Sequence, residues 1–135
     1  MPDHRTENTV QDGSRLRIQD VGGVLWRNNS GAMKTSDGRF LRWGLGNDSV
    51  KVNARRKSSD LIGVTPMLIL PHHVGRTVGV FTAIENKSSG WVYNPYDEHQ
   101  KAQYAFMCDV TKRGGIASFI NDENQLVPFI ERFIK

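Results

Sequence analysis

The sequence predicts a mixed α/β fold in which a small β-sheet is flanked by helices. Two apolar, β-rich runs, Leu61 to Leu70 and Val78 to Ile84, lie near the middle of the chain, and two helical patterns follow them. Strands interleaved with helices in this order are typical of a compact α/β domain. A chain of 135 residues, 38% of them hydrophobic, fits one such domain with a modest core, so residues 1–135 are expected to form a single domain.

The first quarter of the chain predicts one weak helix and one short strand. Residues 1–9 are polar and are expected to be frayed or disordered. Val10 to Val21 follows a helical pattern that Gly13 interrupts, and Val24 to Trp26 reads as a strand. The basic segment from Met33 to Lys57 is then expected to be a long loop, and loops of this length usually carry function or are disordered.

The last third of the chain predicts two helices separated by a strand. Asp97 is a suitable cap for a helix from about Glu98 to Lys112, which places Gln103 on the apolar face. Ile116 to Ile120 reads as a strand, and Asp122 is expected to open the final helix.

The two central apolar runs predict an antiparallel hairpin, because a turn-rich segment separates Leu61 to Leu70 from Val78 to Ile84. Asp60 directly precedes the first run, and Glu85 and Lys87 directly follow the second. Such a hairpin would bring these three charged groups to one edge of the sheet.

This grouping indicates metal-dependent hydrolysis of phosphodiesters. Side chains alternate along a strand, so Glu85 and Lys87 share one face while Asn86 leaves its backbone carbonyl available. Carboxylates of Asp60 and Glu85 and a backbone carbonyl are hard oxygen ligands that suit Mg²⁺ or Mn²⁺. Lys87 would lie beside the attacking water, so Asp60, Glu85 and Lys87 are the expected catalytic set.

The charge of the chain indicates a polyanionic partner. Eighteen basic and fourteen acidic residues give a net charge of +4. The basic residues gather before and around the expected loop, with Phe40 and Trp43 interleaved, and phosphate contacts are expected to flank a nuclease site. The candidate DNA-binding residues are Arg27, Asn28, Arg39, Arg42, Arg55, Arg56 and Lys57.

Several short segments in a fixed order resemble the VRR-NUC domain of the PD-(D/E)XK nuclease superfamily. The resemblance covers roughly residues 24 to 120, and its parts are Leu25-Trp26-Arg27-Asn28-Asn29-Ser30-Gly31, Ser58-Ser59-Asp60-Leu61-Ile62-Gly63, Ala83-Ile84-Glu85-Asn86-Lys87, Gln103 and Gly114-Gly115. It implies a restriction-endonuclease-like core. In that core, Asp60 and Glu85 would bind the metal and Lys87 would be the catalytic lysine.

The same resemblance implies further site residues and a biological setting. Gln103 would be the helix glutamine that supports the site, and Glu7 would correspond to an acidic metal ligand on the first helix. Lys57 stands where the family commonly has glycine. Members of this length are typically phage or prophage proteins, which implies a homodimer that cuts branched DNA, such as four-way (Holliday) junctions, in the cytoplasm of a bacterial host.

Two other functions stay open at this point. One is a DNA-binding module that does not cleave, and the other is a sequence-specific restriction-type endonuclease. The single Cys108 excludes an intramolecular disulfide framework. No apolar stretch approaches the roughly 20 residues needed to cross a bilayer, and Met1 to Gln11 has no signal-peptide core, so no membrane partner and a cytoplasmic location are expected.

Overall fold

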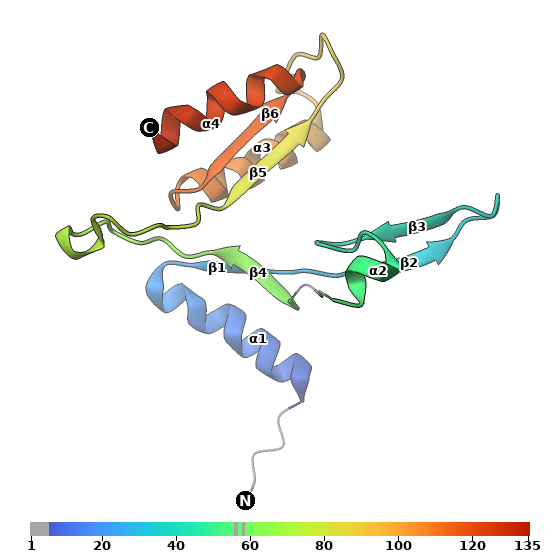
Figure 1. Ribbon diagram of the computed structural model, residues 1–135, viewed down its shortest axis with the longest axis horizontal. Helices are drawn as coiled ribbons and strands as arrows, with labels where there is room; N and C mark the ends of the chain where they lie inside the picture. Colours follow the sequence, from blue (N-terminus) through green and yellow to red (C-terminus); the bar gives the residue numbers. More distant parts are fainter. Residues whose placement is uncertain (1–5, 56, 58) are drawn as a thin grey trace, which may run out of the picture. The chain divides into compact units, whose positions relative to one another are not determined.

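The computed structural model (Figure 1) describes residues 6–55, 57 and 59–135. The chain divides into two compact units, the first ending at Gly63 and the second beginning at Val64. The described residues form a mixed α/β structure with three two-stranded sheets, β1–β4, β2–β3 and β5–β6. The expected α/β class is therefore confirmed.

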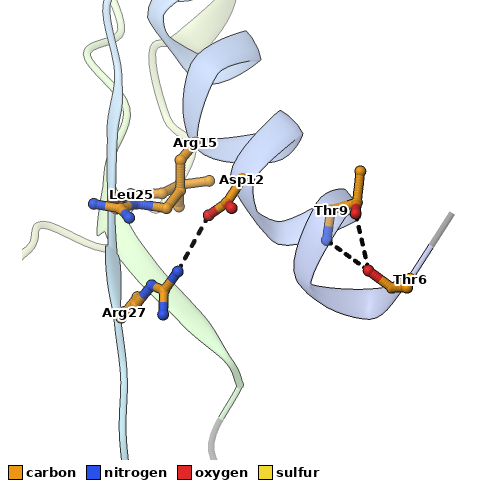
Figure 2. A network of polar contacts seen from close by, with 6 residues as sticks. All are labelled: Thr6, Thr9, Asp12, Arg15, Leu25 and Arg27. Atoms are coloured by element: carbon orange, nitrogen blue, oxygen red, sulfur yellow. Dashed lines mark hydrogen bonds and ion pairs between the residues drawn. The ribbon is translucent and has the colours of Figure 1, made fainter.

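The first unit opens with α1 (Glu7–Arg17), which continues into the 3₁₀ helix η1 (Ile18–Val21). The hydroxyl of Thr6 accepts a hydrogen bond from the Thr9 amide at 3.2 Å (Figure 2). This cap satisfies one of the free amides at the helix start, so α1 begins at Glu7, earlier than the predicted start at Val10.

Side chains of α1 hold the helix to strand β1 (Val24–Arg27), which the sequence predicted. Asp12 forms an ion pair with the Arg27 guanidinium at 3.2 Å, and Arg15 Nε donates a hydrogen bond to the Leu25 carbonyl at 3.3 Å (Figure 2). Both contacts join residues of α1 to the backbone or side chains of β1, so the helix and the strand form one local unit.

Strand β4 (Leu61–Val64) pairs with β1, so the predicted hairpin of Leu61 to Leu70 with Val78 to Ile84 is wrong. Close approach of the two backbones explains the role of Gly63. A Cβ atom at Gly63 would lie 1.7 Å from the Val24 carbonyl oxygen, so only glycine permits this pairing. The wider apolar runs contain no other strand between residues 65 and 81.

The expected loop from Met33 to Lys57 is also wrong, because it contains regular structure. Strands β2 (Gly31–Lys34) and β3 (Phe40–Trp43) form an antiparallel hairpin, and the short helix α2 (Val50–Asn53) follows. The side-chain amide of Asn47 donates to the carbonyls of Gly31 and Trp43 at 2.6 and 2.7 Å. These two bonds fasten the returning chain to both strands at the open end of the hairpin.

The second unit is built on β5 (Thr82–Asn86), α3 (Glu98–Thr111) and β6 (Ile116–Ile120). Strands β5 and β6 are parallel, and α3 is the crossover between them. The unit also contains the 3₁₀ helices η2 (Pro71–His73) and η3 (Glu123–Gln125) and the final helix α4 (Leu126–Ile134).

Three sequence predictions for this unit are confirmed. Asp97 caps α3 by accepting a hydrogen bond from the Gln100 amide at 2.9 Å. Strand β6 has the predicted bounds, and Asp122 caps the η3 turn that leads into the last helix.

The core of the second unit lies where α3 meets β6. Met107 and Val110 of α3 are buried, as are Ile116 and Ile120 of β6. The tight turn before β6 depends on Gly115, where a Cβ atom would lie 2.6 Å from Val110 Cγ1 and 3.0 Å from the Phe81 carbonyl oxygen. Figure 1 shows α3 and α4 on opposite faces of the β5–β6 pair.

Among the residues described, none of the helices combines the length and the apolar character that crossing a bilayer requires.

We expect Gly115→Ala to destabilise the protein by about 1 to 3 kcal/mol, because its methyl group would overpack the fully buried Val110. Urea unfolding followed by far-UV circular dichroism measures the change. Gly79→Ala is the matched control in the same unit, since nothing lies within 4 Å of its Cβ position, and it should change stability by less than about 0.5 kcal/mol. Equal effects of the two substitutions would contradict the packing described for the turn.

Candidate active site

The candidate site in the second unit is organised around the ammonium group of Lys87. Its Nζ donates a hydrogen bond to Gln103 Oε1 at 2.8 Å and lies 3.7 Å from Glu85 Oε1. The Lys87 side chain is only 16% exposed. Lys87 directly follows β5, and its amide donates to the Ile120 carbonyl at 2.7 Å, which extends the strand pairing to the site itself.

Aromatic rings complete the surroundings of this ammonium group. Lys87 Nζ lies 5.4 Å from the centre of the Trp91 ring and 5.6 Å from that of Phe119. The two rings contact each other at 4.8 Å, and Phe119 is the register partner of Glu85. A cation near ring faces gains about 0.5 to 2 kcal/mol, so the rings, Glu85 and Gln103 together restrict where the positive charge can lie.

Strand alternation leaves the Asn86 carbonyl outside the β5–β6 ladder. The Phe81 carbonyl accepts from the Ile116 amide, and the Lys87 amide donates to Ile120, so odd-numbered residues turn their backbone groups toward β6. Backbone groups of successive residues point to opposite sides of a strand. The Asn86 carbonyl therefore points to the other edge of β5, away from β6. The Glu85 side chain is 40% exposed.

A hollow of about 420 Å³ lies between β5 and α3 beside these groups. Glu85 and Gln103 form part of its wall, together with His99 and the apolar side chains of Ala83, Ala102, Phe106 and Met107. The carboxylate that could bind a cation is therefore reached from an open cavity of the second unit.

Asp60 belongs to the first unit, and neighbouring backbone contacts fix its position there. The Asn28 amide donates to the Asp60 carbonyl at 2.9 Å, and the Asn28 side chain donates to the Ser59 carbonyl at 2.8 Å. The Asp60 side chain is exposed. The structure thus brings Glu85, Lys87 and Gln103 together, and the convergence of Asp60 with Glu85 stays a prediction.

The donor atoms at this site suit a hard divalent cation. The Glu85 carboxylate and the Asn86 carbonyl come from consecutive residues and are oxygen donors, which Mg²⁺ and Mn²⁺ prefer. Within the described part of the chain, no three His, Cys, Asp or Glu side chains gather closely enough to hold a metal by themselves. Binding of a metal by Glu85, the Asn86 carbonyl and Asp60 stays a prediction.

The first helix carries two acidic residues, Glu7 and Asp12, with different surroundings. Glu7 is the first residue of α1 and is exposed, whereas Asp12 is the carboxylate that contacts β1. Sequence reasoning did not single out Asp12, because its partner Arg27 lies fifteen positions away and no local spacing links the two. A role of Glu7 as a metal ligand stays a prediction.

Two of the candidate DNA-binding residues have partners inside the first unit. Arg27 is ion-paired with Asp12, and the Asn28 side chain braces the segment before Asp60 through the Ser59 carbonyl. Asn28 thereby positions the backbone at Asp60, and direct contact of Arg27 or Asn28 with DNA stays a prediction.

Arg39 is tied to a carboxylate at the tip of the β2–β3 hairpin. Its Nε donates to Asp37 Oδ2 at 2.7 Å, and the Thr35 hydroxyl donates to Asp37 Oδ1. The hydrogen bond from Thr35, followed by those from Arg39, lowers the pKa of Asp37 below its usual value of 3.8. The charge of Arg39 is therefore largely offset where it stands.

The remaining candidate DNA-binding residues have fewer contacts within the described part of the protein. Arg42 lies over the Phe40 ring, with its Cζ 4.8 Å from the ring centre. Arg55 and Lys57 are exposed, and Lys57 borders a hollow of about 390 Å³ at the base of the hairpin. Arg56 and Ser58 lie outside the described residues.

Comparisons with known proteins add no relative: no family model, curated protein or solved structure matches this chain. The assignment of function consequently depends on the geometry of the site and on the sequence motifs.

We expect Lys87 and Gln103 to be energetically coupled by about 1.5 to 3 kcal/mol, because a hydrogen bond to a half-buried charge exceeds an ordinary one. A double-mutant cycle of Lys87→Met and Gln103→Met, measured by urea unfolding, gives this coupling. Lys101→Met is the control partner, since Lys101 is exposed and bonds to Glu98, so its effect should add to that of Gln103→Met. If the losses of stability from Lys87→Met and Gln103→Met were additive, that result would contradict the hydrogen bond between Lys87 and Gln103.

We expect Asp37 to titrate below pH 3.8, since its hydrogen bonds favour the ionised form. The depressed pKa means that these bonds stabilise the hairpin tip above pH 3.8 and that this stabilisation is lost as the pH falls through the folded-state pKa. Side-chain carboxyl chemical shifts measured by NMR over an acid titration give the value. A pKa of 3.8 or higher would show that the tip is not held in this way.

Proposed function

We propose that this protein is a metal-dependent endonuclease that hydrolyses phosphodiester bonds in DNA, with a PD-(D/E)XK core of the VRR-NUC type. The observation that carries the proposal is the half-buried Lys87 ammonium, held by Gln103 and Glu85 at the end of β5. A lysine fixed two residues after a carboxylate, beside an open hollow, can stabilise the negative charge that develops during phosphodiester hydrolysis.

Each residue has a separate task in this reaction. Lys87 offers a positive charge and a hydrogen-bond donor to the attacking water and to the phosphate oxygen on which charge develops. Gln103 fixes the ammonium group by accepting a hydrogen bond from one of its N–H groups. The other two N–H groups are left to donate to water and substrate. Trp91 and Phe119 hold the same group from the side and exclude part of the solvent.

Mg²⁺ or Mn²⁺ is the cofactor that fits the oxygen donors Glu85, the Asn86 carbonyl and Asp60, with Glu7 as a further candidate. When bound, such an ion supplies Lewis-acid stabilisation of the negative charge that grows on the phosphate. Glu85 would then exchange part of its interaction with Lys87 at 3.7 Å for the cation. That distance is longer than a direct hydrogen bond, so the exchange costs little.

Branched DNA, such as four-way junctions, is the substrate that we propose, with a homodimer as the acting form. Resolving a four-way junction requires cuts in two strands. Two subunits related by a two-fold axis present one identical site to each of these strands. The net charge of +4 favours a polyanionic substrate. This activity would take place in the cytoplasm of a bacterial host cell, as expected for a protein of phage or prophage origin.

A DNA-binding module without cleavage is the second candidate. It is favoured by the absence, among the described residues, of any group of three acidic, histidine or cysteine side chains that could bind a metal. In that case Glu85 and Lys87 would be a permanent ion pair with a structural role.

The test is cleavage of junction, flap and linear duplex DNA in the presence of Mg²⁺. We expect Lys87→Ala, Glu85→Gln and Asp60→Asn each to lower the single-turnover rate by about 100-fold or more, because each removes a group that acts on the reacting phosphate. Lys101→Ala is the matched control, since this lysine lies on α3 but is exposed and paired with Glu98. Its rate should stay within about twofold of that of the unmodified protein.

Wild-type rates for Lys87→Ala and Asp60→Asn would show that the site is wrongly assigned. Tight binding of DNA without cleavage of any substrate would favour the binding module. Discrete fragments from plasmid DNA, with no preference for branched substrates, would indicate a sequence-specific restriction-type endonuclease.

A further inference from the structure

The β2–β3 hairpin has two faces of different chemistry. Residues that oppose each other in an antiparallel pair point to the same side of the ribbon. The register pairs Ala32 with Arg42 and Lys34 with Phe40, which defines a basic face, made of Ala32, Lys34, Phe40 and Arg42. It pairs Gly31 with Trp43 and Met33 with Leu41, which defines an apolar face, made of Gly31, Met33, Leu41 and Trp43.

The basic face joins an exposed ring to two unpaired positive charges. Phe40 is 59% exposed, and the Arg42 guanidinium lies 4.8 Å from its ring centre. One side of the ring is thus covered by Arg42, and the high exposure shows that much of the ring still meets solvent. In the described part of the chain, neither Lys34 nor Arg42 is ion-paired with a carboxylate, whereas Arg39 at the tip is bound to Asp37.

The hairpin is fixed at both ends. At the tip, Asp37 bonds with Thr35 and Arg39, and at the base Asn47 donates to the carbonyls of Gly31 and Trp43. The backbone of a ribbon held in this way loses little conformational freedom when its side chains bind a ligand.

We propose that the basic face of this hairpin is a binding site for single-stranded nucleic acid, in which an unpaired base stacks on Phe40 while Lys34 and Arg42 contact the flanking phosphates. An aromatic ring can stack on any unpaired base, and adjacent cations neutralise the backbone on either side of it. Charge complementarity selects a polyanion over a protein partner, because neither Lys34 nor Arg42 forms an ion pair with a carboxylate among the residues that the structure describes.

A duplex is a poorer ligand for this face than a single strand. Bases inside a duplex are already stacked on each other, so no base surface is free to meet Phe40. The site therefore selects DNA or RNA with unpaired bases. The proposal needs no residue of the candidate active site and does not depend on cleavage.

The experiment is binding of fluorescein-labelled oligothymidylate to the full-length chain, followed by fluorescence anisotropy in EDTA so that no hydrolysis takes place. Phe40→Ala should weaken binding about 5- to 150-fold, the loss that corresponds to one stacked base. Arg42→Ala should weaken binding and reduce the slope of log K against log salt by about 0.7, which is one phosphate contact.

Leu41→Ala is the matched control. Leu41 is the next residue on the same strand, is 52% exposed and belongs to the apolar face, so its loss should leave binding of the oligonucleotide unchanged within about twofold. Phe40→Trp keeps an aromatic surface at the same position and should restore binding. This variant separates loss of stacking from loss of the hairpin fold.

Several results would overturn the proposal. The first is an affinity for the single strand that Phe40→Ala leaves unchanged or that Leu41→Ala lowers equally. The second is failure of Phe40→Trp to bind the single strand. The third is a Phe40→Ala substitution that weakens binding of a blunt duplex as much as binding of the single strand. EDTA prevents hydrolysis, so this assay measures binding separately from cleavage. A protein that binds single strands through Phe40 but cuts no DNA in Mg²⁺ would contradict the proposed nuclease and leave this inference standing.

Discussion

The parallel pairing of β5 with β6 is the constraint on which the candidate site depends. Its register sets Phe119 opposite Glu85, and the bond from the Lys87 amide to Ile120 extends the pairing to the lysine. Because α3 is the crossover between these strands, its packing through Val110 also places Gln103 beside the ammonium group. A small core thereby positions a charge, its acceptor and a carboxylate.

Positive charge in the first unit is divided between structural and unpaired residues. Arg27 and Arg39 are matched by Asp12 and Asp37, and they fasten α1 to β1 and close the hairpin tip. Arg42 has a ring as its neighbour and no acidic partner among the described residues. A count of basic residues therefore overstates the positive charge that is available to bind a polyanion. The strand register locates this available charge, which composition alone does not.

Local signals in the sequence predicted the second unit better than the first. Helix α3, its Asp97 cap and strand β6 follow from short-range periodicity and capping chemistry, and the Glu85–Lys87 grouping follows from strand alternation. Pairing of β4 with β1 spans a long sequence separation and requires Gly63, a condition that no local pattern reveals. Strands of four residues, such as β2 and β3, are too short to show a period, and the rings around Lys87 meet only in the folded chain.

The central claim is that Asp60 and Glu85 bind one divalent cation beside Lys87. The most direct measurement is paramagnetic broadening of amide NMR signals by substoichiometric Mn²⁺ in the full-length protein, because broadening falls steeply with distance from the ion. We expect the amides of Asp60 and of Glu85 to Lys87 to lose intensity together at the lowest Mn²⁺ concentration. Broadening at only one of these two segments, or first at exposed carboxylates elsewhere, would contradict it.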